Sequence, residues 1–528
     1  MKAKSLIYNA RIYTQANNLV VDSMVIRQGR IEAVGHNLQH NSEFRSYKQI
    51  NLQRRTVIPG FVDAHTHFYY FALSLGRVSI EDLDSLDVCL RKIKRYAQGL
   101  NQKEWIVGKG YSPDRFLGRM EPDRYILDKV TGGRPAFIFS KDQHTAWVNS
   151  RALEIAGVSK ETPDPAGGEI VRFEDGVPTG ILREIPAYGK VHSCIQLPSR
   201  QQIDCCYKKA LKHAYKKGVT GVHSFDGPEA FTYFSDLTGK NKVGLRINYY
   251  PAARLLPQLK KTKTRYGTGT GYFRIAGVKI FADGSLGSQT ALCFRRYVGS
   301  KVNYGIEVTP VNEMRRLVRS AARLGLPCAV HAIGDRAVSN VLDAFEGSPP
   351  LPPGVRHRIE HLQLVRRKDL LRIKRLGVVA SMQPSHCPSD IKLIHKYWGA
   401  RGANAFLFRT IINQGIDLAF GSDVPIEPLD PIAGIAAAVR RAKPGSRDIF
   451  YSGERITARE AIYHFTVGPA IACGETDRRG RLLPGYPADF VILSEDINRM
   501  PAARICDTEV LATILNGEVK YCQSPFQL

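Results

Sequence analysis

Short apolar runs alternate with longer amphipathic stretches through the middle of the chain. Runs of four to eight apolar residues are typical of buried strands, whereas apolar residues spaced three or four apart are typical of helices. This alternation predicts βα units around a parallel sheet. Eight strands are predicted, around Val57–His67, Val219–Phe225, Leu245–Tyr250, Phe273–Ala282, Pro327–Ile333, Arg356–Leu362, Val378–Gln383 and Asp417–Ser422.

Eight βα units predict an α/β fold of the (β/α)8 TIM-barrel type, in which function lies at the carboxyl ends of the strands. The first two predicted strands are separated by far more residues than a βα loop needs. We therefore expect residues 70–200 to form a large α/β insertion after the first barrel strand. The strand-like segment Pro135–Phe139 is one element of that insertion.

Both ends of the chain carry short alternating strands with tight turns, such as Gln28-Gly29 and Asn516-Gly517. Two β-rich ends on either side of an α/β middle predict one composite β-sandwich domain. We assign residues 1–58 and 480–528 to this domain and residues 59–479 to the barrel.

The composition is that of a folded protein without a membrane segment. The hydrophobic content of 43% is ordinary for a globular chain, and no apolar run approaches the ~18 residues of a membrane span. Met1–Lys4 leads into a strand-like segment without the apolar core of a signal peptide. The ten cysteines lack paired spacing, so we expect reduced thiols and a cytoplasmic location.

The formal net charge of +26 is spread over many helix-like stretches. No dense basic arm with interleaved aromatic residues occurs, so specific nucleic-acid binding is not expected. A solvated basic surface that steers anionic substrates is the better interpretation. We expect a small-molecule partner, no membrane, and a chain compatible with a homodimer.

Metal-binding residue types occur on five of the predicted strands, at or near their carboxyl ends. They are His65 and His67, Lys279, His331, His361, and Asp423. His65 and His67 are two positions apart and project from one face of a strand, which suits a divalent metal. For any single histidine, a core or loop position is the simpler alternative. Their recurrence at equivalent points favours one shared site.

Lys279 lies within an apolar strand. Burial of a charged lysine is costly, so we expect a lowered pKa. A neutral amine reacts with carbon dioxide to give a carbamate, an anionic ligand that can bridge two metals. The alternative is a lysine that extends to the strand end and pairs with Asp283.

Several segments of the chain resemble the amidohydrolase superfamily, within the subgroup of YtcJ-like proteins and N-substituted formamide deformylases. They cover essentially its whole length: Pro59–Phe68, Asp142–His144, Val148–Ser150, Thr179–Glu184, Val278–Ala291, His331–Asp335, His357–Gln363, Ser381–His386, Gly421–Pro425 and Gly485–Val491. One departure is Gly110-Tyr111-Ser112, where family members often carry Gly-Trp-Asp. This difference concerns the shape of the substrate pocket, not the metal centre.

The resemblance implies two divalent ions, with zinc expected because the ligands are rich in histidine. It implies that His65, His67 and Asp423 bind the more buried ion. His331 and His361 then bind the second, and carbamylated Lys279 bridges both. Asp423 is implied as general base for a metal-activated hydroxide that cleaves a non-peptide carbon–nitrogen bond, in an amide or N-formyl amide.

Two alternatives remain open at this point. A single-metal deaminase would not need Lys279, and a catalytically silent barrel would serve as a binding or scaffold protein. The silent barrel predicts a degraded ligand set, whereas all six positions are filled.

Four further residues are candidates for the substrate side of the site: Asp142, His144, Asp283 and His386. Asp142, His144 and His386 are expected either to contact substrate over the barrel mouth or to hold the insertion in place. Asp283 is expected to orient the loop after the fourth strand. His223 is interpreted as a structural or supporting residue, not a ligand.

Overall fold

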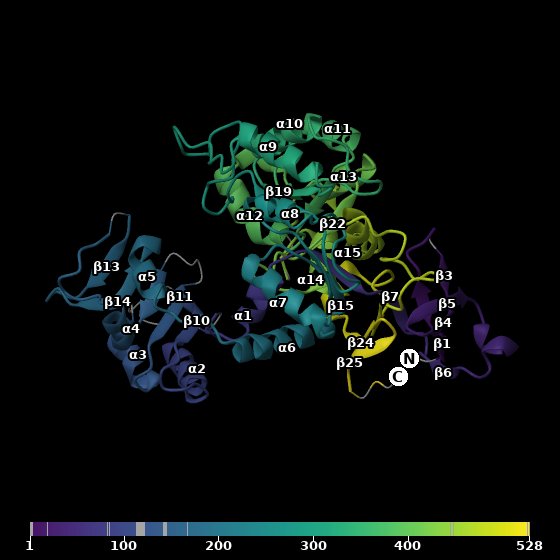
Figure 1. Cartoon of the computed structure of the whole chain (residues 1–528), viewed down its shortest axis with the longest axis horizontal. Coiled ribbons are helices and arrows are strands. Elements are labelled where there is room, and N and C mark those ends of the chain that lie inside the picture. Colours follow the sequence, from purple (N-terminus) through teal and green to yellow (C-terminus); the bar gives the residue numbers. More distant parts are fainter. Residues whose placement is uncertain are drawn as a thin grey trace. The chain divides into compact units, whose positions relative to one another are not determined.

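The computed structural model describes residues 4–17, 19–81, 83, 85–111, 122–140, 145–165, 167–443, 445–446, 448–524, 526 and 528. The chain forms two compact units, Met1–Phe71 with Ala210–Leu528, and Ala72–Lys209 (Figure 1). Across these described ranges, no helix is both long enough and apolar enough to cross a membrane.

The larger unit contains two parallel sheets, ordered β17-β16-β15-β8 and β18-β19-β20-β21-β22. Their strands are β8 Phe61–Thr66, β15 Val219–Ser224, β16 Arg246–Tyr249, β17 Phe273–Ile275, β18 Val278–Phe281, β19 Cys328–Ala332, β20 Arg358–His361, β21 Val379–Met382 and β22 Leu418–Phe420. Every residue of β15, β20, β21 and β22 is buried. Such strands are typical of parallel sheets, which are covered on both faces.

Two parallel bridges connect these two sheets. Thr66, at the end of β8, bridges to Val424, which follows β22. Ala252, after β16, bridges to Lys279 in β18. The single strand predicted over Phe273–Ala282 is divided into β17 and β18. The chain changes partner there, since β17 pairs with β16 and β18 pairs with β19.

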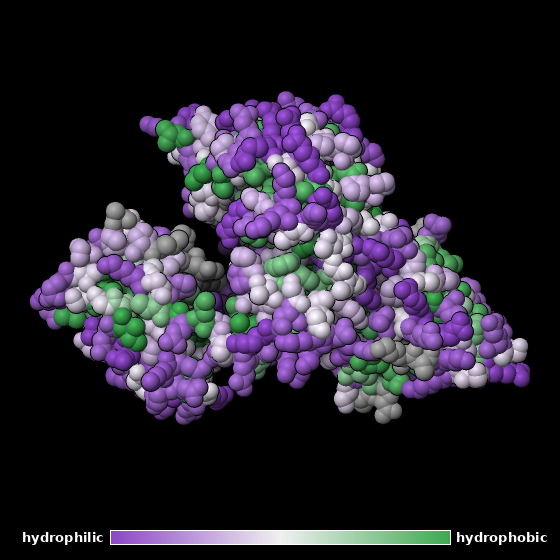
Figure 2. Space-filling model, in the orientation of Figure 1, coloured by the Kyte–Doolittle hydropathy of each residue, from purple (hydrophilic) through white to green (hydrophobic). Residues whose placement is uncertain are grey.

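Helices follow most of the parallel strands. They are α1 Phe68–Ser74, α6 Arg200–Lys216, α7 Pro228–Gly239, α8 Leu256–Lys261, α9 Val311–Ala322, α10 Asp335–Glu346, α11 Arg367–Arg375, α12 His386–Tyr397, α13 Phe408–Asn413, α14 Pro431–Arg440 and α15 Ala458–Ala472. In α9 the buried residues are apolar, whereas its arginines lie on the other face. Figure 2 shows a largely hydrophilic surface over α9, α10 and α11.

Strands from both ends of the chain pair in one further sheet, ordered β25-β24-β23-β7-β2-β3. A second sheet has the order β5-β4-β1-β6, and Figure 1 shows the yellow C-terminal strands beside the purple N-terminal ones. The strands are β1 Lys4–Tyr8, β2 Arg11–Tyr13, β3 Val20–Val21, β4 Ser23–Arg27, β5 Arg30–Gly35, β6 Lys48–Asn51, β7 Thr56–Pro59, β23 Phe490–Leu493, β24 Val510–Leu515 and β25 Glu518–Cys522.

The two tight turns noted in the sequence pack against each other. Gly29 has a φ of +78°, and a Cβ there would lie 2.6 Å from the carbonyl oxygen of Asn516. Only glycine combines this backbone conformation with such a close approach. The contact brings the turn of the N-terminal hairpin onto the Asn516-Gly517 turn.

The smaller unit has a six-stranded mixed sheet, ordered β13-β14-β12-β11-β10-β9. Its elements are β9 Val78–Ser79, α2 Leu86–Gln98, β10 Ile106–Tyr111, α3 Arg124–Thr131, β11 Ala136–Ser140, β12 Thr145–Val148, α4 Ser150–Ile155, β13 Glu169–Arg172, β14 Pro178–Arg183 and α5 Glu184–His192. The buried side chain of Trp147 packs in a cluster with Ile138 and Ile181 from neighbouring strands. The unit therefore has a hydrophobic core of its own.

Candidate metal centre

A cavity of about 430 Å³ lies where the parallel strands of the larger unit end. All six residues predicted as metal ligands line it: His65, His67, Lys279, His331, His361 and Asp423. They come from β8 and the residue that follows it, from β18, β19 and β20, and from the segment after β22. The fold thus gathers at one place residues that are far apart in the sequence.

Three of these residues form a tight group. His65, His361 and Asp423 are buried, and each offers a ligand atom within 4.8 Å of the others. Oδ1 of Asp423 lies 3.6 Å from Nε2 of His65 and 3.5 Å from Nε2 of His67. These separations exceed a hydrogen bond, and they allow nitrogen and oxygen atoms to share one ion.

His331 and Lys279 complete the set of predicted ligands that line the cavity. The ring centroids of His331 and His361 are 4.5 Å apart. Nε2 of His331 donates to the carbonyl of Gly284 at 3.1 Å, which leaves Nδ1 unprotonated in the neutral ring. The Lys279 amine lies 4.6 Å from the Phe225 ring and 4.9 Å from the Phe281 ring, and the residue is 3% exposed.

Glu360 sets the orientation of His65, and the sequence analysis did not identify it. Its Oε2 lies 2.6 Å from Nδ1 of His65. A carboxylate there holds the imidazole proton on Nδ1, so Nε2 of His65 is left as an electron-pair donor. The signal in the sequence was the pair Arg358 and Glu360, two charged residues two positions apart in a predicted strand.

Arg358 in turn holds Glu360. Its guanidinium is completely buried and donates to both oxygens of Glu360. It also donates to the carbonyl of Ala64 and to the hydroxyl of Ser381, each at 2.7 Å. Nδ1 of His223 lies 2.7 Å from the same guanidinium. His223 therefore supports the site through Arg358.

Hydrogen bonds through Asp63 connect the end of β8 to the end of β22. Oδ1 of Asp63 accepts hydrogen bonds from the backbone N–H groups of His65 and Ser422, at 3.1 and 2.9 Å. A Cβ at Gly421 would lie 2.4 Å from the backbone nitrogen of His65, so this approach requires glycine. Asp423 has a φ of +62°, an uncommon conformation for a residue with a side chain.

Burial dominates the electrostatics of this group. It lowers the pKa of His67 to about 4 and that of His331 to about 3, and it lowers the pKa of His65 and His361 well below the ordinary value. The imidazoles are therefore neutral at physiological pH, which is the form that binds metals.

Asp423 and Lys279 are shifted in opposite directions. Burial raises the pKa of Asp423 to about 7, and nearby Lys279 only partly offsets this. Burial also lowers the pKa of Lys279 to about 8.

Nδ1 of His361 is buried and has no hydrogen-bond partner among the residues that the structure describes. Neutral imidazoles, a carboxylate and an orphaned nitrogen are a donor set that fits divalent metal.

The remaining predicted residues fall into three groups. Asp283 is buried and accepts hydrogen bonds from the backbone of Leu292, Ile333 and Gly334, so its carboxylate holds the loop after β18. His386 lines the cavity, with Nε2 4.0 Å from Oδ2 of Asp423. Asp142, His144 and Ser112 lie outside the described residues.

Two acidic residues that line the metal cavity, Asp390 and Glu427, were not among the site residues predicted from the sequence. Asp390 accepts a hydrogen bond from Gln363 at 2.5 Å, and Glu427 accepts one from Ser389 at 2.6 Å. Burial raises the pKa of both carboxyls, that of Asp390 to about 6. Both follow the strand ends in sequence, but neither belongs to a motif that points to metal.

Comparison with known proteins agrees with this geometry. The model of the amidohydrolase family matches residues 48–521. The putative amidohydrolase YtcJ of Bacillus subtilis is 31% identical, over 95% of this chain and 96% of its own. The N-substituted formamide deformylase of Arthrobacter pascens is 26% identical, over 98% of each chain.

A solved structure supports the same assignment. An uncharacterized metal-dependent hydrolase from Pyrococcus furiosus has a TM-score of 0.79 and 30% identity, covering 94% of this chain and 100% of its own. Together with a family match that spans most of the sequence, this establishes the relationship. The chain belongs to the amidohydrolase family.

Proposed function

We propose that this protein is a metal-dependent hydrolase that cleaves a non-peptide carbon–nitrogen bond in a small-molecule amide or N-formyl amide. The observation that carries the proposal is the convergence of all six predicted ligands on one cavity. The family match and the relative named as a deformylase support the reaction class.

We assign His65, His67 and Asp423 to one ion and His331 and His361 to a second, with zinc as the expected metal. When bound, such ions activate water at neutral pH and polarise a carbonyl group. Glu360 and Arg358 keep the His65 ring in the required tautomer and orientation.

Lys279 is proposed to carry a carbamate, whose anionic oxygens would help to hold the ions. Burial lowers the pKa of Lys279 and so favours the neutral amine that carbamate formation requires. The nitrogen lone pair forms a bond to the carbon of carbon dioxide, one C=O π bond breaks with its electron pair going to oxygen, and the nitrogen loses a proton to solvent. The product is an anion, which the aromatic rings of Phe225 and Phe281 alone would not stabilise.

Asp423 is proposed as the general base. A carboxyl with a pKa of about 7 is suited to accept and return a proton at physiological pH. Its Oδ1 lies between two imidazoles, so Oδ2 is the oxygen proposed to take the proton from the attacking water. The same oxygen then passes the proton to the departing amine nitrogen.

We further propose that the two parallel sheets close into a (β/α)8 barrel. The two bridges between the sheets, Thr66–Val424 and Ala252–Lys279, support this closure. The terminal sheets are proposed as a composite β-sandwich domain, because β7 from the N-terminal part pairs with β23 from the C-terminal part.

The proposal is tested with full-length protein loaded with zinc in the presence of bicarbonate. Elemental analysis should give close to two ions per chain, and a panel of N-acyl and N-formyl amines should include a compound that is hydrolysed. Asp417→Asn is the control variant for both measurements, since Asp417 pairs with Arg356 outside the cavity. A stoichiometry near one that zinc and bicarbonate leave unchanged would favour a deaminase. Two bound ions without turnover of any amide would contradict the proposal.

A further inference from the structure

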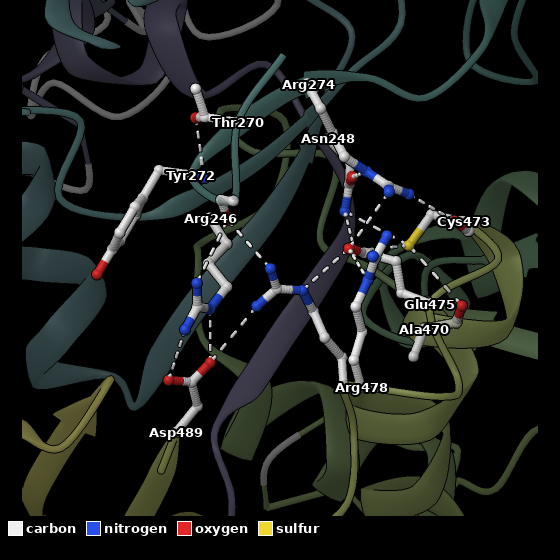
Figure 3. A network of polar contacts seen from close by, with 12 residues as sticks. Arg246, Asn248, Thr270, Tyr272, Arg274, Ala470, Cys473, Glu475, Arg478 and Asp489 are labelled. Atoms are coloured by element: carbon white, nitrogen blue, oxygen red, sulfur yellow. Dashed lines mark hydrogen bonds and ion pairs between the residues drawn. The ribbon is translucent and has the colours of Figure 1, made fainter. Parts of the chain in front are cut away.

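A second polar site lies around β15 and β16, apart from the metal cavity (Figure 3). It encloses a cavity of about 30 Å³, and Gly221, His223, Arg246 and Arg479 are among its lining residues. That volume corresponds to one water-sized particle. Its polar lining has more side chains that donate hydrogen bonds than carboxylates that accept them.

His223 presents an unsatisfied donor. Its Nδ1 lies 2.7 Å from a guanidinium nitrogen of Arg358, and a guanidinium can only donate. Nδ1 must therefore be the acceptor, so the proton of the neutral imidazole is on Nε2. His223 is 0% exposed, and Nε2 has no partner among the described residues. A buried N–H without an acceptor is unfavourable.

Arg479 presents another unsatisfied donor. Its Nε donates to Glu475 at 3.1 Å, and its Nη2 donates to the carbonyl of Gly271 at 3.0 Å. Nη1 is buried, and in the described part of the chain no atom accepts a hydrogen bond from it. Oδ2 of Asp489, at 3.7 Å, is too far for a hydrogen bond.

The two carboxylates at this site, those of Asp489 and Glu475, already accept hydrogen bonds from the protein. Asp489 accepts two hydrogen bonds from Arg246, at 2.6 and 3.0 Å. Oε1 of Glu475 accepts from Arg478 and Arg479, and Oε2 lies 3.3 Å from the amide nitrogen of Asn248 and 3.4 Å from the thiol of Cys473 (Figure 3). They leave little capacity to accept the hydrogens of a bound water.

The buried arginines around this cavity outnumber the carboxylates that pair with them. The side chains of Arg246, Arg274 and Arg479 are only 11%, 8% and 14% exposed, which gives three largely buried positive charges. Glu475 and Asp489 supply two negative charges, so one positive charge remains (3 − 2 = 1). Arg478, half exposed at 50%, adds further positive charge at the rim.

We propose that this cavity binds a small monovalent anion of the halide class, such as chloride. Such an ion accepts hydrogen bonds from all directions, so it satisfies the Nε2–H of His223 and Nη1 of Arg479 together. It also neutralises the remaining positive charge, which a water molecule does not. The site is separate from the metal centre, because Arg358 and Glu360 lie between His223 and His65.

The decisive test uses crystals of the full-length, metal-loaded protein grown in sodium bromide. We expect an anomalous peak within hydrogen-bond distance of Nε2 of His223 and Nη1 of Arg479. An ordinary water there, with no anomalous signal at high bromide concentration, would overturn the proposal. This result does not depend on any variant folding.

Thermal unfolding gives a solution test with a matched control. At constant ionic strength, replacing gluconate by chloride should raise the Tm of the wild type by about 2 °C in a saturable manner. Arg479→Lys should lose this rise, whereas Arg478→Lys should keep it, because Arg478 lies at the exposed rim. Equal Tm values of the wild type in both salts, or equal rises in both variants, would contradict the assignment.

Discussion

Two buried carboxylates in the larger unit have opposite electrostatics, although both lie among many charged groups. Burial raises the pKa of Asp423 in the metal cavity to about 7. Burial acts in the same direction on Glu475, but Arg479 and Arg274 outweigh it and lower the pKa of Glu475 to about 2. The difference lies in the partners: Glu475 is neutralised by cations of the chain, whereas Asp423 is not.

This comparison separates two uses of buried charge. A carboxylate held by guanidinium groups stabilises the fold and is not available to a ligand. One whose charge the chain leaves largely uncompensated is costly in the free protein and is suited to metal binding or proton transfer. Asp423 and Lys279 are of the second kind, and the Arg358–Glu360 pair of the first kind supports them.

The largest effect is expected from Asp423→Asn. Asparagine retains the shape and a ligand oxygen but cannot accept a proton, so kcat/KM should fall by about 10²–10⁴ while metal content declines modestly. The measurement is kcat/KM against pH at matched metal occupancy. The wild type should lose activity on the acid side, and the residual rate of the variant should lack the Asp423 contribution. A variant within a few-fold of the wild type would leave Asp423 a ligand only.

Glu475→Gln should affect stability instead of catalysis. Removing this charge leaves the guanidinium groups of Arg274 and Arg479 buried without their partner, which should cost about 3–5 kcal/mol in the free energy of unfolding. Urea denaturation measures this, with metal content as the second readout. Glu346→Gln is the matched control, because Glu346 also pairs with two arginines but is 36% exposed, and its loss should cost under about 1 kcal/mol. Equal losses in both variants would remove the distinction between the two sites.

Glu475 should also make the free energy of unfolding depend on pH. Because the folded-state pKa of Glu475 is lowered to about 2, its stabilisation is complete above the unfolded value of 4.5 and is lost as the pH falls toward 2. The difference in unfolding free energy between wild type and Glu475→Gln should therefore shrink by about 2 kcal/mol from pH 6 to pH 3. Urea titrations at several pH values test this. A constant difference would show that the pKa of Glu475 is not lowered by its arginines.

The smallest effect on stability is expected from Lys279→Met. Methionine fills similar space without the cost of a buried amine, so the unfolding free energy of the metal-free protein should change by under about 1 kcal/mol or increase. Metal content and turnover should both fall, because the proposed carbamate ligand is lost. Calorimetry of the metal-free protein and elemental analysis of the loaded protein measure the two effects. A large loss of metal-free stability, with both ions still bound, would place Lys279 among the structural charges.

Several features of the site were accessible to sequence reasoning because they lie in local patterns. His65 and His67 are two positions apart at the end of an apolar run, and Lys279 stands out within another. The recurrence of such residues on successive strands predicted that they would meet. The cavity that they line agrees with that expectation, although their roles as ligands stay a prediction.

Other features depend on contacts between distant segments. Glu360 is recognisable as an orienting residue only because the fold places it 2.6 Å from His65, and Arg358 only because it is buried beside Glu360. The acidic wall formed by Asp390 and Glu427 likewise has no signature in the sequence.

The sequence by itself determined the elements and the family, because apolar periodicity and short motifs are local properties of the chain. The tertiary structure alone decided which charges from distant segments are paired. Glu475 and Asp423 are both buried acidic residues, yet Glu475 meets Arg274 from a distant segment as well as Arg478 and Arg479, whereas Asp423 meets three histidines, His65, His67 and His386. The physical reason is that a pKa or a pairing depends on distances of a few ångströms across the fold, which no local pattern encodes.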